Sequence, residues 1–218
     1  MSSTIEPTFL FASPVYIFSR PEWIKPLIKK TDPYIKEAKK RNKDLIKKFK
    51  SDFGLSHHST TLLADNVFDD FQKFVGQSSA NILNSQGFNL TNHTLVFTEL
   101  WVQEFAEKGG GHHVSHIHYN NHISGFYFLK GSDKTSRPFF DDPRPGALMS
   151  KLPEQKQERS SLASPQINFP PTPGNFMFFN SYMPHGFHVD RGNDRFRFIH
   201  WNMQAVPNNL LQSNVEKI

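Results

Sequence analysis

The amino-acid sequence predicts a mainly β protein with flanking helices, an α+β chain in which helices pack outside a β-sandwich or barrel. Two observations support this fold class. Apolar residues recur at about every 3.6 positions in two segments before residue 90, which is typical of amphipathic helices. After residue 90 the chain becomes a series of short segments rich in β-branched and aromatic residues, which favours strands. The 218 residues are enough for one domain with a sizeable core.

Residues 1–90 are expected to form an N-terminal edge segment and two helices that pack on the barrel. Residues 9–18 are aromatic and apolar with one proline, which predicts an extended edge segment. A helix is expected to begin at Asp32, with Asp32 as its N-cap and Pro33 as its first residue. A second helix is predicted from about residue 66 to residue 85, with Gly87 just beyond its end.

The barrel core is expected over residues 91–206, inside a single domain that spans residues 1–218. Alternation and β-branched content predict strands at residues 93–105, 123–130, 166–169, 175–180, 186–190 and 195–204. The polar, proline-containing stretch 131–165 is predicted to be a long functional or partly disordered loop.

The positive charge of the chain is concentrated in one segment. The formal net charge is +5, yet residues 25–50 alone hold eleven Lys and Arg against three Asp and Glu. The remainder of the chain is therefore slightly acidic. We interpret the segment as the solvated face of a packed helix, and weak contact with a polyanion stays open as an alternative.

The chain contains no cysteine, which excludes disulfides, thiolate zinc sites, iron–sulfur clusters and cysteine nucleophiles. Any metal site must use His, Asp or Glu ligands, which points to iron, manganese or a histidine-type zinc site. The longest apolar run is far shorter than the ~20 residues of a membrane helix. We therefore expect a soluble cytoplasmic protein without membrane contact, as a monomer or homodimer.

Five of the eleven histidines lie between residues 112 and 122. His116 and His118 have the i, i+2 spacing that places two imidazoles on one face of a strand, where they can bind adjacent positions of a divalent metal. His185 and His188 are candidates for a third ligand. Arg195 follows His185 by ten residues, enough to finish one strand and return along an antiparallel neighbour. A guanidinium there would bind a carboxylate, so this pattern predicts a metal site for an anionic chelating cosubstrate.

Four segments, taken in order, resemble the 2-oxoglutarate/Fe(II)-dependent oxygenase family. They are HIHYNNHISGFYFLK (116–130), FFDDPRPG (139–146), PTPGNFMFFNSYMPHGF (171–187) and DRFRFIHWN (194–202). The family shows a His-x-His segment, a Ser-Gly-x-Tyr segment, a later His and an Arg in the same order. The resemblance covers about residues 93–204, roughly half the chain. It implies a double-stranded β-helix (a jelly roll of the cupin-like kind) with Fe(II) near one mouth.

The resemblance also implies roles for individual residues. His116 matches the first metal ligand, His185 the distal histidine, and Arg195 the residue that grips the far carboxylate of 2-oxoglutarate. His118 stands where most relatives in the wider superfamily have Asp or Glu, so the ligand set would be three histidines.

Two further residues keep two interpretations each. Tyr127 would hydrogen-bond a cosubstrate carboxylate or would simply be a barrel residue with its hydroxyl satisfied. Asn202 would orient the metal ligands or the cosubstrate, or would be a turn former. Histidines 112, 113, 122, 188 and 200 are interpreted as ordinary loop and strand residues.

The function predicted from these residues and this resemblance is a 2-oxoglutarate-dependent, non-haem Fe(II) oxygenase that hydroxylates its substrate. Its expected requirements are Fe(II), 2-oxoglutarate and O₂, with ascorbate as a further reductant. Two alternatives stay open: a cupin-like three-histidine dioxygenase that does not use 2-oxoglutarate, and a non-catalytic jelly-roll binding protein. The residue types fit a peptide, a nucleotide and a small-molecule substrate equally well.

Overall fold

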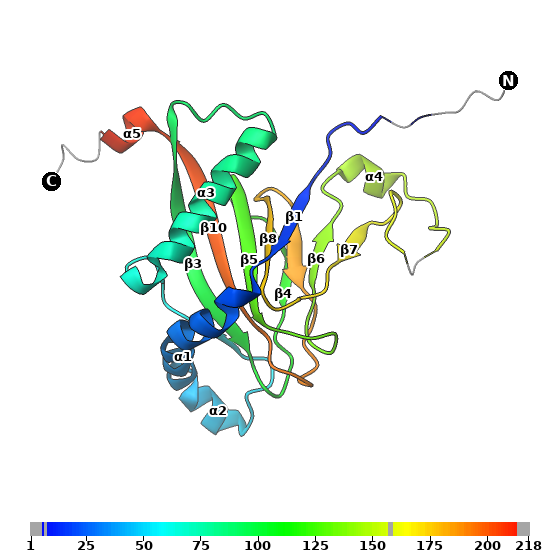
Figure 1. The fold of residues 1–218 in the computed structure, drawn as a ribbon. Helices are drawn as coiled ribbons and strands as arrows, with labels where there is room; N and C mark the ends of the chain where they lie inside the picture. The colour runs from blue at the N-terminus through cyan, green and yellow to red at the C-terminus, as the bar shows by residue number, and fades with distance from the viewer. Residues whose placement is uncertain (1–5, 7, 157–158, 213–218) are drawn as a thin grey trace.

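Two antiparallel sheets, packed face to face, form the body of the protein (Figure 1). The structure is a computed structural model and describes residues 6, 8–156 and 159–212. The large sheet has the strand order β1-β8-β5-β10-β3-β2, and the small sheet has the order β4-β9-β6-β7. The strands are β1 (Val15–Ser19), β2 (Ser56–His58), β3 (His93–Phe105), β4 (His113–His116), β5 (Ile123–Lys130), β6 (Pro138–Asp141), β7 (Gln166–Asn168), β8 (Asn175–Asn180), β9 (His185–Phe187) and β10 (Arg197–Pro207).

The eight strands from β3 to β10 divide between the two sheets as in a double-stranded β-helix. Strands β3, β5, β8 and β10 lie in the large sheet, and β4, β6, β7 and β9 lie in the small one. The predicted fold class, a mainly β jelly roll with flanking helices, is therefore confirmed. Strands β1 and β2 extend the large sheet at its two edges, so part of the N-terminal region is built into the sheet rather than packed on it.

Helices cover the outer face of the large sheet, where α3 crosses β3, β10 and β5 and α1 lies toward one end of the sheet (Figure 1). The helices are α1 (Ile24–Arg41), α2 (Lys43–Phe49), α3 (Asp69–Ser85), α4 (Pro145–Met149) and α5 (Asn208–Gln212). Leu27 and Ile35 from α1 and Phe71 and Val75 from α3 pack in one cluster with Trp201 of β10. Burial of this apolar surface attaches the helices to the sheet.

The first helix begins earlier than the sequence predicted. Helix α1 starts at Ile24, after a 3-10 turn over Pro21–Trp23, and Pro33 lies inside it. The expected N-cap at Asp32 is therefore wrong. Pro33 removes one backbone donor, but the helix retains its buried face, with Leu27 and Ile35 on either side of the proline. The second helix was predicted correctly, because α3 follows a 3-10 turn at Asn66–Phe68 and ends at Ser85.

Aromatic side chains fill the space between the two sheets. From the large sheet Phe126, Phe179 and Phe198 point inward, and from the small sheet Phe140 and Phe187 meet them. All five are buried and in ring contact with one another or with His185. One end of this apolar interior therefore adjoins a histidine.

The predicted strands at 93–105, 123–130 and 175–180 match β3, β5 and β8 residue for residue. The predicted loop 131–165 is only partly a loop, because it contains the buried strand β6 and helix α4. Strand β9 begins at His185, one residue earlier than predicted, and β10 runs on to Pro207. In the part of the chain that the structure describes, no helix combines the length and apolar character needed to cross a membrane.

Candidate metal centre

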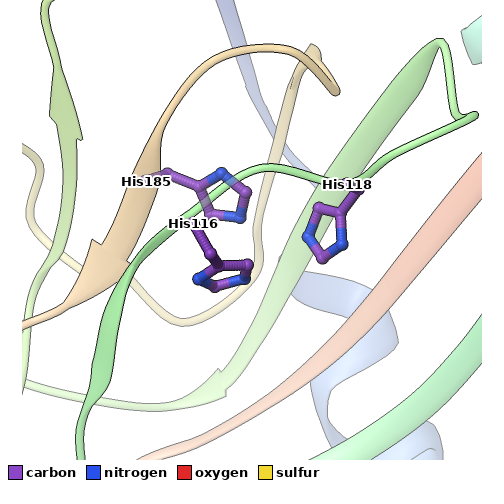
Figure 2. A group of neighbouring side chains, drawn as sticks. All are labelled: His116, His118 and His185. Atoms are coloured by element: carbon purple, nitrogen blue, oxygen red, sulfur yellow. The ribbon is translucent and has the colours of Figure 1, made fainter.

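Three imidazoles converge at one mouth of the barrel: His116 at the end of β4, His118 just after it, and His185 at the start of β9 (Figure 2). The ring centroid of His116 lies 4.6 Å from that of His185, and the ring of His118 lies 5.0 Å from each of the other two. One nitrogen from each ring lies within 4.8 Å of the nitrogens of the others. The structure thus brings together the three histidines that the sequence proposed as ligands.

Backbone pairing places the three rings. Strand β4 pairs antiparallel with β9, and His116 lies directly opposite His185 in the ladder. The backbone N–H of His118 donates to the carbonyl of Ser181 at 3.1 Å, which holds the segment after β4 beside the turn that precedes β9. The β4–β9 ladder therefore directs His116 toward His185, and one backbone hydrogen bond just outside the ladder holds His118 beside them.

Hydrogen bonds at the Nδ1 atoms leave the Nε2 atoms of two rings available. Nδ1 of His116 lies 2.8 Å from the carbonyl oxygen of Val114, and Nδ1 of His185 lies 2.9 Å from that of Met183. A carbonyl only accepts, so each Nδ1 carries the ring proton and each Nε2 presents a lone pair. Nε2 of His185 is buried without a hydrogen-bond partner among the described residues. This arrangement suits a metal ligand.

His118 is held by a polar network. The amide nitrogen of Asn202 lies 3.0 Å from Nδ1 of His118 and donates to the Glu99 carboxylate at 2.9 Å, while its oxygen accepts from Ser124 at 2.6 Å. In this orientation Nδ1 accepts, so the neutral ring carries its proton on Nε2. Binding a metal through Nε2 requires the proton to move to Nδ1 and the Asn202 amide to turn its oxygen toward the ring. Nε2 of His118 is likewise buried and without a partner.

Burial keeps two of these rings neutral. Burial lowers the pKa of His185 to about 3, with further lowering by neighbouring histidines, although its hydrogen bond to Met183 opposes the shift. Burial and the neighbouring His116 lower the pKa of His118 to about 4, against a small opposing effect of Glu99. Neutral imidazole is the form that binds a metal, so the site does not have to expel protons at neutral pH. The donor set fits Fe(II) and other divalent transition metals.

Arg195 is not brought to the histidines, and its expected placement is wrong. Its side chain is 58% exposed and pairs with Glu107 at 2.8 Å. On β10 the residues that face the barrel interior have even numbers, as Phe198 and Asn202 show, whereas Arg197 faces helix α1. Ten residues do bring the chain back antiparallel, but Arg195 lies before the strand begins and does not enter the interior.

Tyr127 also lies away from the histidines. It is on the outer face of β5, where its hydroxyl donates to the carbonyl of Arg20 at 2.7 Å and its ring packs on Phe71 and Phe176. Of its two sequence-based interpretations, the barrel residue with a satisfied hydroxyl is the one that the structure shows. Asn202, in contrast, contacts His118 directly.

Among the described residues, no Lys or Arg faces the interior where it would bind the far carboxylate of 2-oxoglutarate. Among the residues that the structure describes, Arg197 is the only buried Lys or Arg, and it pairs with Glu104 and Asp32 on the helix side of the sheet. Next to His185 the interior is lined by phenylalanine rings. A carboxylate placed against these rings would have no Lys or Arg partner among the described residues, so the histidines account for a metal but the interior does not identify which group binds this carboxylate.

The other histidines of the cluster are placed as expected, with one exception. His112 contacts the Gly110 carbonyl, His122 accepts from the backbone of Ala205, and exposed His188 contacts Asn168. His200, interpreted from the sequence as an ordinary strand residue, lies fully buried with its ring 4.9 Å from that of His118. Glu99 is a second residue that the sequence reasoning missed. The signal for both was available, since residues 200 and 202 share a strand face and Glu99 pairs with Asn202.

Comparisons with known proteins bear on the fold and on the family of the matched segment. Residues 99–198 match the family model described as "Putative 2OG-Fe(II) oxygenase". No curated protein matches the chain. One similar solved structure is an oxidoreductase of the 2OG-Fe(II) oxygenase family from Burkholderia pseudomallei, with 11% identity, coverage of 65% of this chain and 59% of that chain, and a TM-score of 0.44. A second is a prolyl-4-hydroxylase from Pseudomonas putida, with 10% identity, coverage of 88% of this chain and 93% of that chain, and a TM-score of 0.51. A third is AviO1 from Streptomyces viridochromogenes Tue57, with 13% identity, coverage of 88% of this chain and 90% of that chain, and a TM-score of 0.53.

The chain therefore spans about three fifths of the first structure and nine tenths of the other two. At these identities the structural likeness establishes the fold alone. The family match covers the segment from Glu99 to Phe198, which contains all three converging histidines. The resemblance predicted from the sequence is thus confirmed: this chain has a double-stranded β-helix fold, and its residues 99–198 are similar to the 2-oxoglutarate/Fe(II) oxygenase family.

Proposed function

We propose that this protein is a non-haem Fe(II) oxygenase that uses 2-oxoglutarate and O₂ to hydroxylate an organic substrate. The observation that carries the proposal is the convergence of His116, His118 and His185 within 4.8 Å, with two of their Nε2 atoms buried and unpartnered. The match of residues 99–198 to the oxygenase family supports 2-oxoglutarate as the cosubstrate. Bound Fe(II) would supply the redox chemistry with O₂ that attacks a C–H bond.

The side chains of this protein would do the positioning. Three neutral imidazoles would hold the metal without neutralising its charge, so the ion attracts an anionic chelating group more strongly than one held by a carboxylate ligand. The rings of Phe126, Phe140 and Phe179 contact His185 and exclude water on the inner side. His116 is only half-buried and Tyr119 nearby is exposed, so a substrate would approach from this outer side.

Anaerobic titration of the protein with Fe(II) and then 2-oxoglutarate tests the proposal. We expect a visible charge-transfer band, and succinate formation once O₂ is admitted. Replacement of the buried ligand (His185→Ala) should abolish both and lower Fe(II) affinity by at least about 100-fold. The matched control is His188→Ala, which removes an exposed histidine on the same segment. Wild-type protein that binds Fe(II) but gives neither band nor succinate would overturn the 2-oxoglutarate proposal.

One alternative is a three-histidine dioxygenase that does not need 2-oxoglutarate and so needs no Lys or Arg facing the interior. Because Arg195 is exposed and paired with Glu107, Arg195→Ala should leave the affinity for 2-oxoglutarate unchanged within about twofold. Measuring O₂ consumption with and without 2-oxoglutarate separates the two functions. Ascorbate enters these assays only as a reductant that keeps the iron as Fe(II).

A further inference from the structure

His200 is a buried imidazole that the three-histidine group does not use. Only 1% of its surface is exposed, and neither ring nitrogen has a hydrogen-bond partner among the described residues. Its ring packs between Trp101 at 4.5 Å, Phe126 at 5.3 Å and His118 at 4.9 Å. A buried polar group normally has a partner, so the position of His200 indicates that something else completes it.

A carboxylate lies beside His200. Glu99 is on β3 next to β10, and its Oε2 lies 3.9 Å from Nε2 of His200. The same carboxylate accepts from the indole N–H of Trp101 at 3.2 Å and from the amide of Asn202 at 2.9 Å. Because the Glu99 side chain is 49% exposed, an ion can reach it from solvent.

His118 completes the group. One ligand atom each from Glu99, His118 and His200 lies within 4.8 Å of the others, the same limit that the three-histidine group meets. The amide nitrogen of Asn202 contacts both Nδ1 of His118 and the Glu99 carboxylate, so it lies between them, and this side of the His118 ring faces Glu99. The two groups of ligands therefore adjoin each other and share one imidazole.

We propose that Glu99, His118 and His200 form a second divalent transition-metal site next to the three-histidine site. Two imidazoles and one carboxylate are a donor set that Zn²⁺, Fe²⁺, Co²⁺ and Mn²⁺ accept. With both ions bound, His118 would release its ring proton to solvent and hold the first ion through Nε2 and the second through Nδ1 as a bridging imidazolate. The second ion would then replace the contact between Nδ1 and Asn202. The second ion binds more weakly, because it shares a ligand with a neighbouring cation and displaces a hydrogen bond.

The proposal is tested by the number of Co²⁺ ions that the purified full-length chain binds, measured by equilibrium dialysis with metal analysis and followed by Co²⁺ absorption. Wild type should bind two ions, of which Glu99→Gln removes the weaker and the double variant His116→Ala/His185→Ala removes the tighter. His118→Ala should weaken both. Glu99 is exposed enough for its replacement to leave the fold intact, and Glu107→Gln is the matched control, because Glu107 is an exposed carboxylate in the turn just after the same strand.

The outcomes separate this proposal from the proposed function. The second site is overturned if Glu99→Gln binds the same number of Co²⁺ ions as the wild type, whether that number is one or two. One ion that is lost in Glu99→Gln but retained in His116→Ala/His185→Ala supports the Glu99 site and contradicts a metal centre at His116 and His185. Thermal unfolding of each metal-free variant is the control for folding: an unfolding temperature close to that of the metal-free wild type shows that the loss of an ion does not come from unfolding.

Discussion

Asn202 is the residue on which the chemistry of His118 depends. Its amide can either donate to Nδ1 of His118, as it does here, or turn and accept from it. The two orientations place the ring proton on opposite nitrogens, and only one of them frees Nε2 for a metal. Ser124 can serve both orientations, because a hydroxyl donates and accepts, whereas Glu99 can only accept.

Asn202→Leu should therefore weaken Fe(II) binding by about 10- to 100-fold while the three histidines stay in place. Leucine keeps the volume but neither accepts from nor donates to the ring, so the orientation of His118 is lost. Anaerobic Fe(II) titration measures the change. Asn180→Leu is the control, since it removes another buried amide, one that pairs with Gln86 and touches no histidine ring. Equal loss of affinity in both variants would contradict a role specific to Asn202.

The sequence predicts which way a side chain points only where the strand is known, because odd and even positions of a strand face opposite sides of the sheet. His116 and His118 are two apart, so their shared direction followed from spacing, and the resemblance selected His185. Arg195 was counted by distance along the chain, but its face depends on where β10 begins, and β10 begins at Arg197. The register between β10 and β5 also shifts between Arg197 and Phe198, and the spacing of residues in the sequence does not reveal this shift.

At the scale of elements, one ionic cluster joins helix α1 to the large sheet. Glu104 of β3 pairs with Arg197 of β10 at 2.7 Å, with Lys39 of α1 at 2.7 Å and with Lys130 of β5 at 3.6 Å. Arg197 also donates to Asp32 of α1 at 2.6 Å. Burial by itself would raise the pKa of Glu104, but Arg197 and Lys39 outweigh it and lower the pKa to about 2.

This cluster predicts an acid-sensitive attachment of α1. The folded pKa of Glu104 lies below the ordinary value of 4.5, so its stabilisation is complete above about pH 4.5 and is lost as the pH falls toward 2. The shift corresponds to roughly 3 kcal/mol of unfolding free energy. Urea unfolding between about pH 7 and pH 2.5 measures the loss, and Glu104→Gln should remove this contribution to the slope.

The same replacement leaves the buried Arg197 with only the more exposed carboxylate of Asp32, so it should also cost roughly 3 kcal/mol at neutral pH. Glu107→Gln, at an exposed carboxylate near Lys39 and Arg195, should change stability by less than about 1 kcal/mol. Identical acid profiles for wild type and Glu104→Gln would refute the assignment.

The elements that the sequence predicted well are those whose pattern is long enough to be read locally. Strand β3 has 13 residues and β5 has 8, and their apolar and β-branched content marks them clearly. Strands β4 and β6 have four residues each and exist because the neighbouring β9 pairs with both. The sequence predicts too late a start for helix α1, because proline is favoured at the first position of a helix. In the structure Pro33 lies inside α1, which packs on the sheet on both sides of the proline.

At the scale of the whole molecule, the positive charge is concentrated in one segment, residues 25–50. Helices α1 and α2 carry the basic excess, and most of their lysines are exposed, including Lys36, Lys43 and Lys47. We propose weak, salt-dependent binding of polyanions to this surface. The wild type should be retained on heparin at low salt and elute below about physiological ionic strength.

Lys36→Glu/Lys43→Glu/Lys47→Glu should elute at clearly lower salt than the wild type. Lys134→Glu/Lys151→Glu, at exposed lysines outside the segment, should elute nearer to the wild type. Equal shifts per charge for both variants would mean that only net charge matters and that the helices form a solvated face without a partner.

The central place of β10 has a consequence for how the molecule is made. Strand β10, the last strand that the structure describes, lies between β3 and β5 and supplies Asn202 and His200. During synthesis β3 and β5 therefore cannot be joined into one sheet until residues 197–207 have been made. Such non-local pairing slows folding, so the contacts of His118 with Asn202 and His200 form only after this strand has closed the sheet.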